Sequence, residues 1–261
     1  MIYIYSEGRM KRADSLRQAL ELEDTRLREQ RPVISVVGAG GKTTMLRRLA
    51  DEYMQTGTPV FVTTTTHIMN EDRPWFVPGT SEEKIREVLQ KYGQVWAGMP
   101  APGRKLGILP ESLLKTISRW KIPILIEADG ARRLPVKVPS GYEPVIRPDT
   151  THVLSVYGLD GVGKRIEDAV FRPELAEALL NKKRTECIAA RDIAILASSD
   201  FGGRKGCPQK AVYTVVLNKV DYEEHKKTAL AICRALEEKG IHRVIVTGRD
   251  NGEVREADTG K

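Results

Sequence analysis

The sequence predicts an α/β fold with a mostly parallel sheet and helices on both faces. From residue 33 onward, apolar runs rich in β-branched residues alternate with segments of helical periodicity, an order typical of parallel sheets. Several runs are apolar throughout, as expected for strands covered on both faces. A glycine cluster, GAGGKTT at residues 38–44, joins the first of these strands to a helix.

The first 30 residues are predicted to form a helical lead, and residues 31–261 a nucleotide-binding α/β domain. Apolar side chains recur at helical spacing among charges in residues 11–30, at Leu16, Ala19, Leu20 and Leu27. Pro32 is expected to end this helix.

The elements of the domain follow in order. Helices are predicted at residues 43–54, 81–93 and 225–240, the last ending at Gly240. Strands are predicted at the apolar runs of residues 33–37, 59–66, 94–98, 122–130, 151–158, 192–198, 211–221 and 242–248.

Composition narrows the classes of ligand. With 261 residues, 41% of them hydrophobic, the chain can bury a sizeable core. Its net charge of +7 favours acidic ligands such as nucleotides. No run of Lys or Arg interleaves with aromatic residues, so no nucleic-acid partner is expected. Three dispersed cysteines without a C-x-x-C pair, and no apolar stretch of about 20 residues, predict a cytoplasmic protein without a membrane span.

The glycine cluster is predicted to bind the phosphates of a nucleotide. It matches G-x-x-x-x-G-K-[ST] in part, because Val36 stands where the first glycine belongs. Backbone N–H groups and the helix amino terminus favour an anion there, Lys42 reaches the terminal phosphates, and Thr43 is a ligand for Mg²⁺. The predicted P-loop residues are Gly38, Ala39, Gly40, Gly41, Lys42, Thr43 and Thr44.

A second glycine-rich segment, GLDGVGKR at residues 158–165, has the textually correct spacing. It ranks lower because Arg165 replaces the metal-binding hydroxyl and Pro173 limits any helix that begins there. Whether it contacts a ligand or only turns the chain is left open by the sequence.

Two acids and a threonine tract follow neighbouring strands. Glu127 and Asp129 end an apolar run, where a P-loop enzyme needs an acid for its metal or water. Lys42, Glu127 and Asp129 are therefore the predicted catalytic residues, and Thr43, Glu127 and Asp129 the predicted Mg²⁺ ligands. Residues 63–67, TTTTH, end another strand, where hydroxyls can face a γ-phosphate. His67 lacks metal-ligand spacing.

The segment LNKVD matches the N-K-x-D motif, which follows a late strand in GTPases. Asn218, Lys219 and Asp221 are the residues concerned. A carboxylate there accepts hydrogen bonds from guanine N1 and N2, whereas adenine offers no such pair of donors. The motif therefore favours GTP over ATP, the alternative being a polar loop after a strand.

In succession, GAGGKTT, VTTTTHI, EADGAR, GLDGVGK, FRPEL and LNKVD resemble the YqeC family, described as selenium-dependent hydroxylase accessory proteins or selenium cofactor biosynthesis proteins. The resemblance implies a role in maturing molybdenum hydroxylases that carry a labile selenium cofactor, with such a hydroxylase or its cofactor as partner. It supports Gly38, Gly40, Gly41, Lys42 and Thr43 as the loop, with Glu127 and Asp129 as its acids, but supplies no reaction.

Three functions remain open from the sequence. The first is an NTP hydrolase whose turnover gates cofactor delivery or insertion, and NKVD favours it. The second is an ATP-dependent ligase or kinase, because GAGGKTT also describes the phosphate loop of Mur-type ligases. The third is a scaffold that binds a nucleotide without hydrolysing it.

Overall fold

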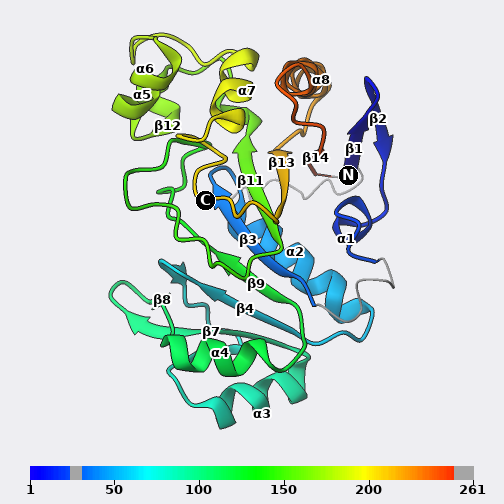
Figure 1. The fold of residues 1–261 in the computed structure, drawn as a ribbon, viewed down its shortest axis with the longest axis vertical. Coiled ribbons are helices and arrows are strands. Elements are labelled where there is room, and N and C mark those ends of the chain that lie inside the picture. Colours follow the sequence, from blue (N-terminus) through cyan, green and yellow to red (C-terminus); the bar gives the residue numbers. More distant parts are fainter. Residues whose placement is uncertain (24–30, 250–261) are drawn as a thin grey trace, which may run out of the picture.

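The computed structural model describes residues 1–23 and 31–249, and it confirms the predicted α/β class. A 12-stranded sheet has the order β2-β1-β14-β13-β11-β3-β9-β4-β7-β8-β5, with β6 beside β7 (Figure 1). All pairings from β14 to β7 are parallel. The parallel strands are β3 (Val33–Gly38), β4 (Val60–Thr64), β6 (Phe76–Pro78), β7 (Gln94–Ala101), β9 (Ile124–Glu127), β11 (His152–Gly158), β13 (Val212–Asn218) and β14 (Val244–Thr247).

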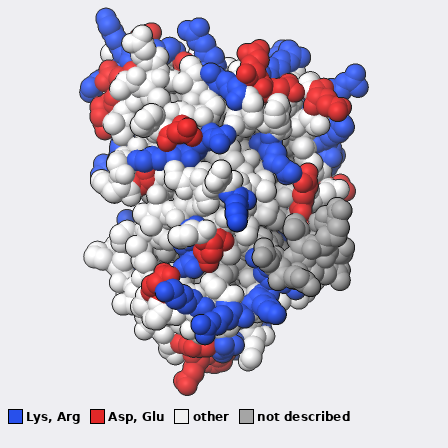
Figure 2. Space-filling model, in the orientation of Figure 1, with Lys and Arg blue, Asp and Glu red and all other residues white. Residues whose placement is uncertain are grey.

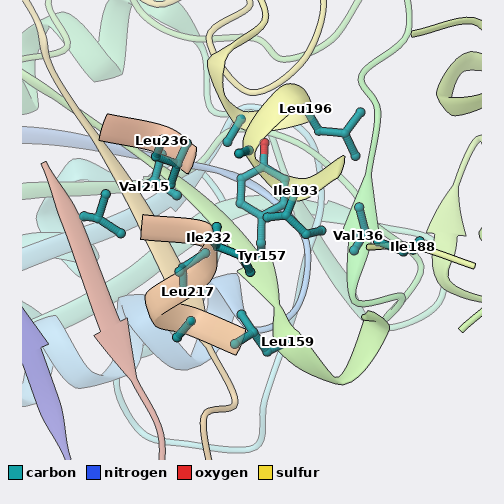
Figure 3. Close-up of a cluster of buried hydrophobic side chains, with 14 of the residues drawn as sticks. Val136, Tyr157, Leu159, Ile188, Ile193, Leu196, Val215, Leu217, Ile232 and Leu236 are labelled. Atoms are coloured by element: carbon teal, nitrogen blue, oxygen red, sulfur yellow. The ribbon is translucent and has the colours of Figure 1, made fainter. Parts of the chain in front are cut away.

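Helices cover both faces of this sheet. On one face, Met45 and Leu49 of α2 (Lys42–Gln55) pack with Val36 of β3. On the other, α7 (Ala190–Ser198) and α8 (Glu223–Glu237) cover β13 (Figure 3), and α3 (Glu82–Tyr92) and α4 (Glu111–Ser118) cover β4 and β9. Successive strand residues thus enter opposite cores, which explains the unbroken apolar runs.

Smaller elements complete the described part. Antiparallel strands close the sheet at both edges, with β1 (Ile2–Ser6) and β2 (Arg9–Arg12) at one and β8 (Lys105–Gly107) and β5 (Ile68–Met69) at the other. A separate parallel pair joins β10 (Val136–Lys137) to β12 (Val170–Phe171). A 3₁₀ turn, η2 (Leu159–Gly161), and helices α5 (Ile166–Ala169) and α6 (Pro173–Leu180) lie between β11 and α7.

The predicted helix over residues 11–30 is wrong for most of its described length. Residues 11 and 12 belong to β2, and only α1 (Leu16–Ala19) is helical. Glu21 adopts a left-handed φ of 58°, which ends the helix. The apolar stripe at Leu16, Ala19 and Leu20 is buried as expected. The rest of that prediction, residues 24–30, lies outside the described residues.

The predicted strand over residues 192–198 is also wrong, since these residues belong to α7. The Asp192 carboxylate accepts the Ala189 N–H at 2.7 Å and so satisfies a donor at the helix start. Ile193, Ala194, Leu196 and Ala197 are all buried. A short, continuously apolar run does not distinguish a buried strand from a buried helix, and here tertiary packing favours the helix.

Parallel pairing brings the polar strand ends to one edge. Glu127 of β9 is in register with Val36 on one side and with Thr64 on the other. Gly38 is in register with Val156 of β11. The acids, the threonine tract and the glycine cluster therefore meet at the carboxyl edge of the sheet. No helix in the described part of the chain has the length and apolarity to cross a membrane.

Candidate functional site

The glycine cluster forms a tight turn between β3 and α2. Gly38 and Gly40 have φ values of 89° and 79°, in the left-handed region. A Cβ on Gly38 would lie 2.5 Å from the Val156 oxygen, and one on Gly40 would lie 2.2 Å from the Gly158 nitrogen. Both positions therefore require glycine for conformation and for space.

The N–H groups of this turn fall into two sets. In the first set, the Gly38 N–H donates to Asp129 Oδ2 at 3.0 Å. The Ala39 N–H donates to Val156 O at 2.9 Å, and the Gly40 N–H donates to Leu134 O at 3.1 Å. For residues 41–44, at the amino end of α2, the structure shows no acceptor within the described ranges 1–23 and 31–249. This second set is oriented as an anion site requires.

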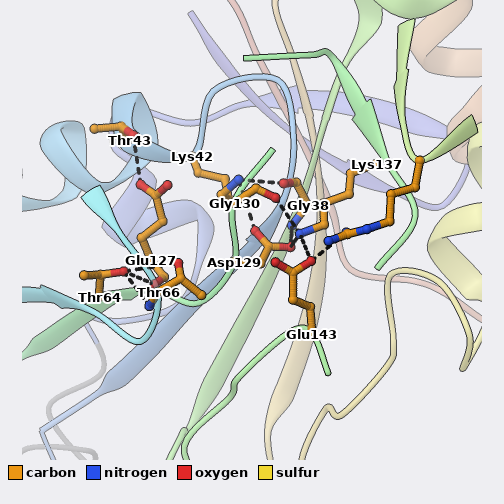
Figure 4. A network of polar contacts seen from close by, with 11 residues as sticks. Gly38, Lys42, Thr43, Thr64, Thr66, Glu127, Asp129, Gly130, Lys137 and Glu143 are labelled. Atoms are coloured by element: carbon orange, nitrogen blue, oxygen red, sulfur yellow. Dashed lines mark hydrogen bonds and ion pairs between the residues drawn. The ribbon is translucent and has the colours of Figure 1, made fainter. Parts of the chain in front are cut away.

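Lys42 is folded back onto the loop. Its Nζ lies 2.7 Å from Gly38 O and 3.1 Å from Asp129 Oδ1, and its side chain is 5% exposed. Asp129 Oδ2 accepts the Gly38 N–H and lies 3.0 Å from Lys137 Nζ. Asp129 thus ties two lysines to the start of the glycine turn (Figure 4).

Lys137 and Glu143 are site residues that sequence reasoning missed. The Lys137 side chain is fully buried, and its Nζ lies 2.8 Å from Glu143, which also pairs with Arg172 at 2.6 Å. Burial raises the pKa of Glu143, but hydrogen bonds from Lys137 and Arg172 outweigh it and lower the pKa below its usual value. The sequence did indicate this ion pair, because Lys137 lies between Val136 and Val138 and a cation within a buried apolar run needs an acidic partner.

Thr43 and Glu127 form the second contact of the loop. Thr43 Oγ1 donates to Glu127 Oε2 at 2.8 Å. Burial raises the pKa of Glu127, although Lys42 and the Thr43 hydroxyl oppose the shift. Thr64 Oγ1 donates to the Glu127 carbonyl at 2.8 Å and accepts the Thr66 N–H at 2.9 Å, which shows how the threonine tract shapes this edge.

The three residues predicted as Mg²⁺ ligands therefore have different surroundings. The Thr43 hydroxyl and the Glu127 carboxylate adjoin each other, and both are oxygen donors of the kind that Mg²⁺ prefers. Asp129 instead faces Lys42, Lys137 and a backbone N–H. Within the described residues there is no group of three or more His, Cys, Asp or Glu residues placed to hold a metal.

The NKVD residues are divided between the loop and the protein surface. Asn218 Nδ2 donates to Gly40 O at 2.8 Å, and its Oδ1 accepts the Thr247 hydroxyl at 2.8 Å. Lys219 pairs with Asp160 at 2.8 Å. Asp221 Oδ1 accepts the Arg249 N–H at 2.8 Å. Asn218 therefore braces the glycine turn, whereas Asp221 contacts the end of the described chain.

The second glycine-rich segment packs beneath the first. Gly158 N donates to Pro135 O at 2.8 Å, beside Gly40. Lys164 is exposed, and its carbonyl accepts the Ile188 N–H at 2.9 Å. Arg165 pairs with Asp168 at 2.8 Å. This segment supports the turn at Gly40, and its lysine is not among the residues that line the cavity over that turn.

A cavity of about 670 Å³ opens over the glycine turn. This volume lies within the range typical of small-molecule sites. Lys42, Glu127 and Lys219 line it, whereas Asp221 and Lys164 do not. The full lining comprises Gly40, Gly41, Lys42, Thr43, Thr44, Thr66, His67, Ile68, Met69, Lys105, Glu127, Gly130, Ala131, Arg132, Arg133, Leu134, Glu143, Phe171 and Lys219.

Two comparisons with known proteins give the same result. A family model described as YqeC protein matches residues 34–174, more than half of the chain. A protein of Escherichia coli (strain K12), named uncharacterized protein YqeC, is 30% identical over 190 residues, which cover 69% of this chain and 73% of that protein. The family match includes the glycine turn, Glu127, Asp129 and Lys137, and ends before Asn218.

Proposed function

The chain belongs to the YqeC protein family, and we propose that it acts as a Mg²⁺-dependent NTP hydrolase. We further propose that this activity serves the maturation of the selenium cofactor of molybdenum hydroxylases in the cytoplasm. One observation carries the nucleotide part of the proposal, the 2.8 Å contact between Thr43 and Glu127 at the amino end of α2. The pathway part rests on the family resemblance alone.

Each residue has a distinct task in this proposal. The N–H groups of residues 41–44 bind phosphate oxygens, and Lys42 turns from Gly38 O towards the terminal phosphates. Thr43 and Glu127 hold Mg²⁺, directly or through water, and the metal neutralises charge that develops on the phosphates. Asp129 keeps Lys137 and the Gly38 N–H as partners when Lys42 leaves, so it stays paired throughout.

GTP is the proposed nucleotide. Lys219 lines the cavity, and Asn218 braces Gly40, so two residues of NKVD adjoin the loop. Reading of guanine further requires Asp221 to turn a carboxylate oxygen towards the base. ATP is the alternative nucleotide, and the preference for GTP rests on the NKVD motif.

A ligase or kinase is the second candidate, and the residues that line the cavity on the side away from Lys219 favour it. His67, Met69 and Lys105 also line the cavity, and they follow or belong to strands on the opposite side of β3 from β13 and Lys219. A hydrolase needs only water at that end, whereas a transferase needs room for an acceptor. A scaffold that leaves the nucleotide intact is the third candidate.

Turnover by purified protein tests the nucleotide part. We expect release of phosphate from GTP that requires Mg²⁺, and loss of that release in Thr43→Ala. Glu127→Gln should leave binding measurable but reduce turnover by at least about tenfold, as expected for loss of a charged metal partner. Mass spectrometry of the copurifying nucleotide identifies the base. Absence of nucleotide binding by the wild type would overturn the proposal, and intact bound nucleotide would favour the scaffold.

Deletion of the gene tests the pathway part. We expect loss of selenium-dependent hydroxylase activity while the hydroxylase polypeptide accumulates, and a strain complemented with Lys42→Ala should behave like the deletion. Selenocysteine insertion should be unchanged, because it proceeds through translation. Full hydroxylase activity in the Lys42→Ala strain would show that the nucleotide site is dispensable.

A further inference from the structure

Three cations on the cavity wall have no acidic partner in the described structure. Lys105, Arg132 and Arg133 all line the cavity and are exposed, and none forms an ion pair with an acid among residues 1–23 and 31–249. The two other lysines of the lining, Lys42 and Lys219, pair with Asp129 and Asp160. Lys and Arg side chains are interspersed with Asp and Glu over the face in Figure 2, whereas these three line one cavity together.

Lys105 lies on one side of the phosphate loop, and the two arginines lie in a turn that is bonded to the loop. In the sheet order, β13, which precedes Lys219, lies on one side of β3. On the other side lie β9, β4, β7 and β8, which carries Lys105. Arg132 and Arg133 follow β9 in a turn that crosses the glycine turn, since Leu134 O accepts the Gly40 N–H and Pro135 O accepts the N–H of Gly158 in β11. A nucleotide whose base lies towards Lys219 would direct its terminal phosphate towards Glu127, and the cavity beyond Glu127 would remain open.

The backbone holds the two arginines in place. Arg132 and Arg133 have left-handed φ values of 46° and 63°, a conformation that is strained for side chains other than glycine. The turn is closed by a 3.0 Å bond from Leu134 N to Ala131 O and tied to the glycine turn by the bond from Gly40 N to Leu134 O. Consecutive strained residues are characteristic of ligand-binding segments.

The cavity lining also includes apolar side chains. Arg132 lies over the Phe171 ring, with its guanidinium carbon 5.2 Å from the ring centre. Met69 is 42% exposed and also lines the cavity. A guanidinium group binds phosphate or carboxylate through paired hydrogen bonds, and the neighbouring apolar side chains can pack against the body of a ligand.

We propose that Met69, Lys105, Arg132, Arg133 and Phe171 form an anion subsite for a second ligand, a small molecule with a phosphate or carboxylate group. This subsite rests on the proposed function, because it lies beside the terminal phosphate of the nucleotide. It takes its ligand while the nucleotide is bound, which distinguishes it from the phosphate loop.

Titration with inorganic phosphate and with acetate tests the subsite. Each anion is added to wild-type protein saturated with Mg²⁺ and a non-hydrolysable GTP analogue, and binding is followed by amide chemical shifts. We expect binding of at least one anion, weakened by about tenfold in Arg132→Gln/Arg133→Gln and in Lys105→Gln, since each lost charge-assisted hydrogen bond contributes that order of affinity. Phosphate alone or acetate alone identifies the preferred group.

Matched controls are Arg119→Gln and Lys115→Gln, two exposed cations on and after α4, which should bind the anions as the wild type does. The nucleotide affinity of the subsite variants should change less than about twofold. Equal anion binding in subsite variants and wild type would overturn the proposal, as would a large loss of nucleotide affinity, which would assign the arginines to the nucleotide itself.

Failure of the proposed function is separable from failure of the subsite. If the wild type binds no nucleotide, the same titration is made without one, comparing Lys42→Ala with the arginine variant. Loss of anion binding in the arginine variant alone supports the subsite. Loss in Lys42→Ala alone assigns the anion to the glycine turn and overturns the proposal.

Discussion

The Nζ of Lys42 and the Oδ1 of Asp129 lie 3.1 Å apart, and both side chains are almost completely buried. Charges so far from water interact strongly and are costly to leave unpaired. Lys42, the lysine expected to reach the terminal phosphates, is therefore paired with Asp129, and Asp129 also forms an ion pair with Lys137. This arrangement allows Lys42 to exchange partners without leaving Asp129 alone.

Replacing Lys42 should remove nucleotide binding. Lys42→Ala loses the charged donor to the phosphates, and we expect Mg²⁺-dependent affinity to fall by at least about 30-fold. Lys164→Ala is the matched control, because that lysine is exposed and lies outside the cavity lining. Fluorescent nucleotide titration measures both. Equal losses would mean that the two glycine-rich segments bind together.

Replacing Lys137 should destabilise the fold. Lys137→Met leaves Asp129 and Glu143 without their shared cation in a buried site, which costs about 3–5 kcal/mol when one partner of a buried pair is removed. Urea unfolding measures the change. Lys115→Met, at an exposed position of α4, should change stability by less than about 0.5 kcal/mol. A similarly small change in Lys137→Met would show that the network contributes little to folding.

Acid should weaken the fold through His152. Burial lowers the pKa of His152 from 6.5 to about 4, so the folded state keeps this ring neutral where the unfolded state takes up a proton. Its contribution to stability is complete above pH 6.5 and is lost as the pH falls towards 4. The loss amounts to about 3 kcal/mol, at 1.36 kcal/mol for each unit of pKa.

Urea unfolding at pH 7.5 and at pH 4.5 measures this loss. In His152→Asn, the difference in unfolding free energy between the two pH values should shrink by about 2 kcal/mol or more. His242, which is exposed, provides the control His242→Asn. An unchanged pH dependence in His152→Asn would assign the acid sensitivity to other groups.

Replacing Asp221 should change the preferred base. Asp221→Asn exchanges an acceptor for a donor, so GTP should bind more weakly and xanthosine triphosphate more tightly, because xanthine has a carbonyl where guanine has an amine. Competition against a fluorescent nucleotide measures both affinities, with ATP as the reference. Preference of the wild type for ATP, or no exchange of preference in the variant, would mark NKVD as a coincidental loop.

The parallel sheet and the glycine turn could be predicted from the sequence because their signals are local. The strand at residues 33–37, the helix at 43–54 and the acids after residue 126 all occupy the predicted places. Periodicity, apolar runs and glycine spacing depend on neighbours along the chain, so they can be read without the fold. The meeting of Thr43 with Glu127 followed from parallel strands sharing a carboxyl edge.

Contacts between distant segments were decided only by the tertiary structure. β1 pairs with β14 from the opposite end of the described chain, and the run at residues 192–198 is helical because it packs over β13. Lys137 joins Asp129 and Glu143, while Asp221 stays outside the cavity lining that includes Lys219. Each depends on which surfaces become buried together, and that burial, unlike periodicity, exists only once the chain has folded.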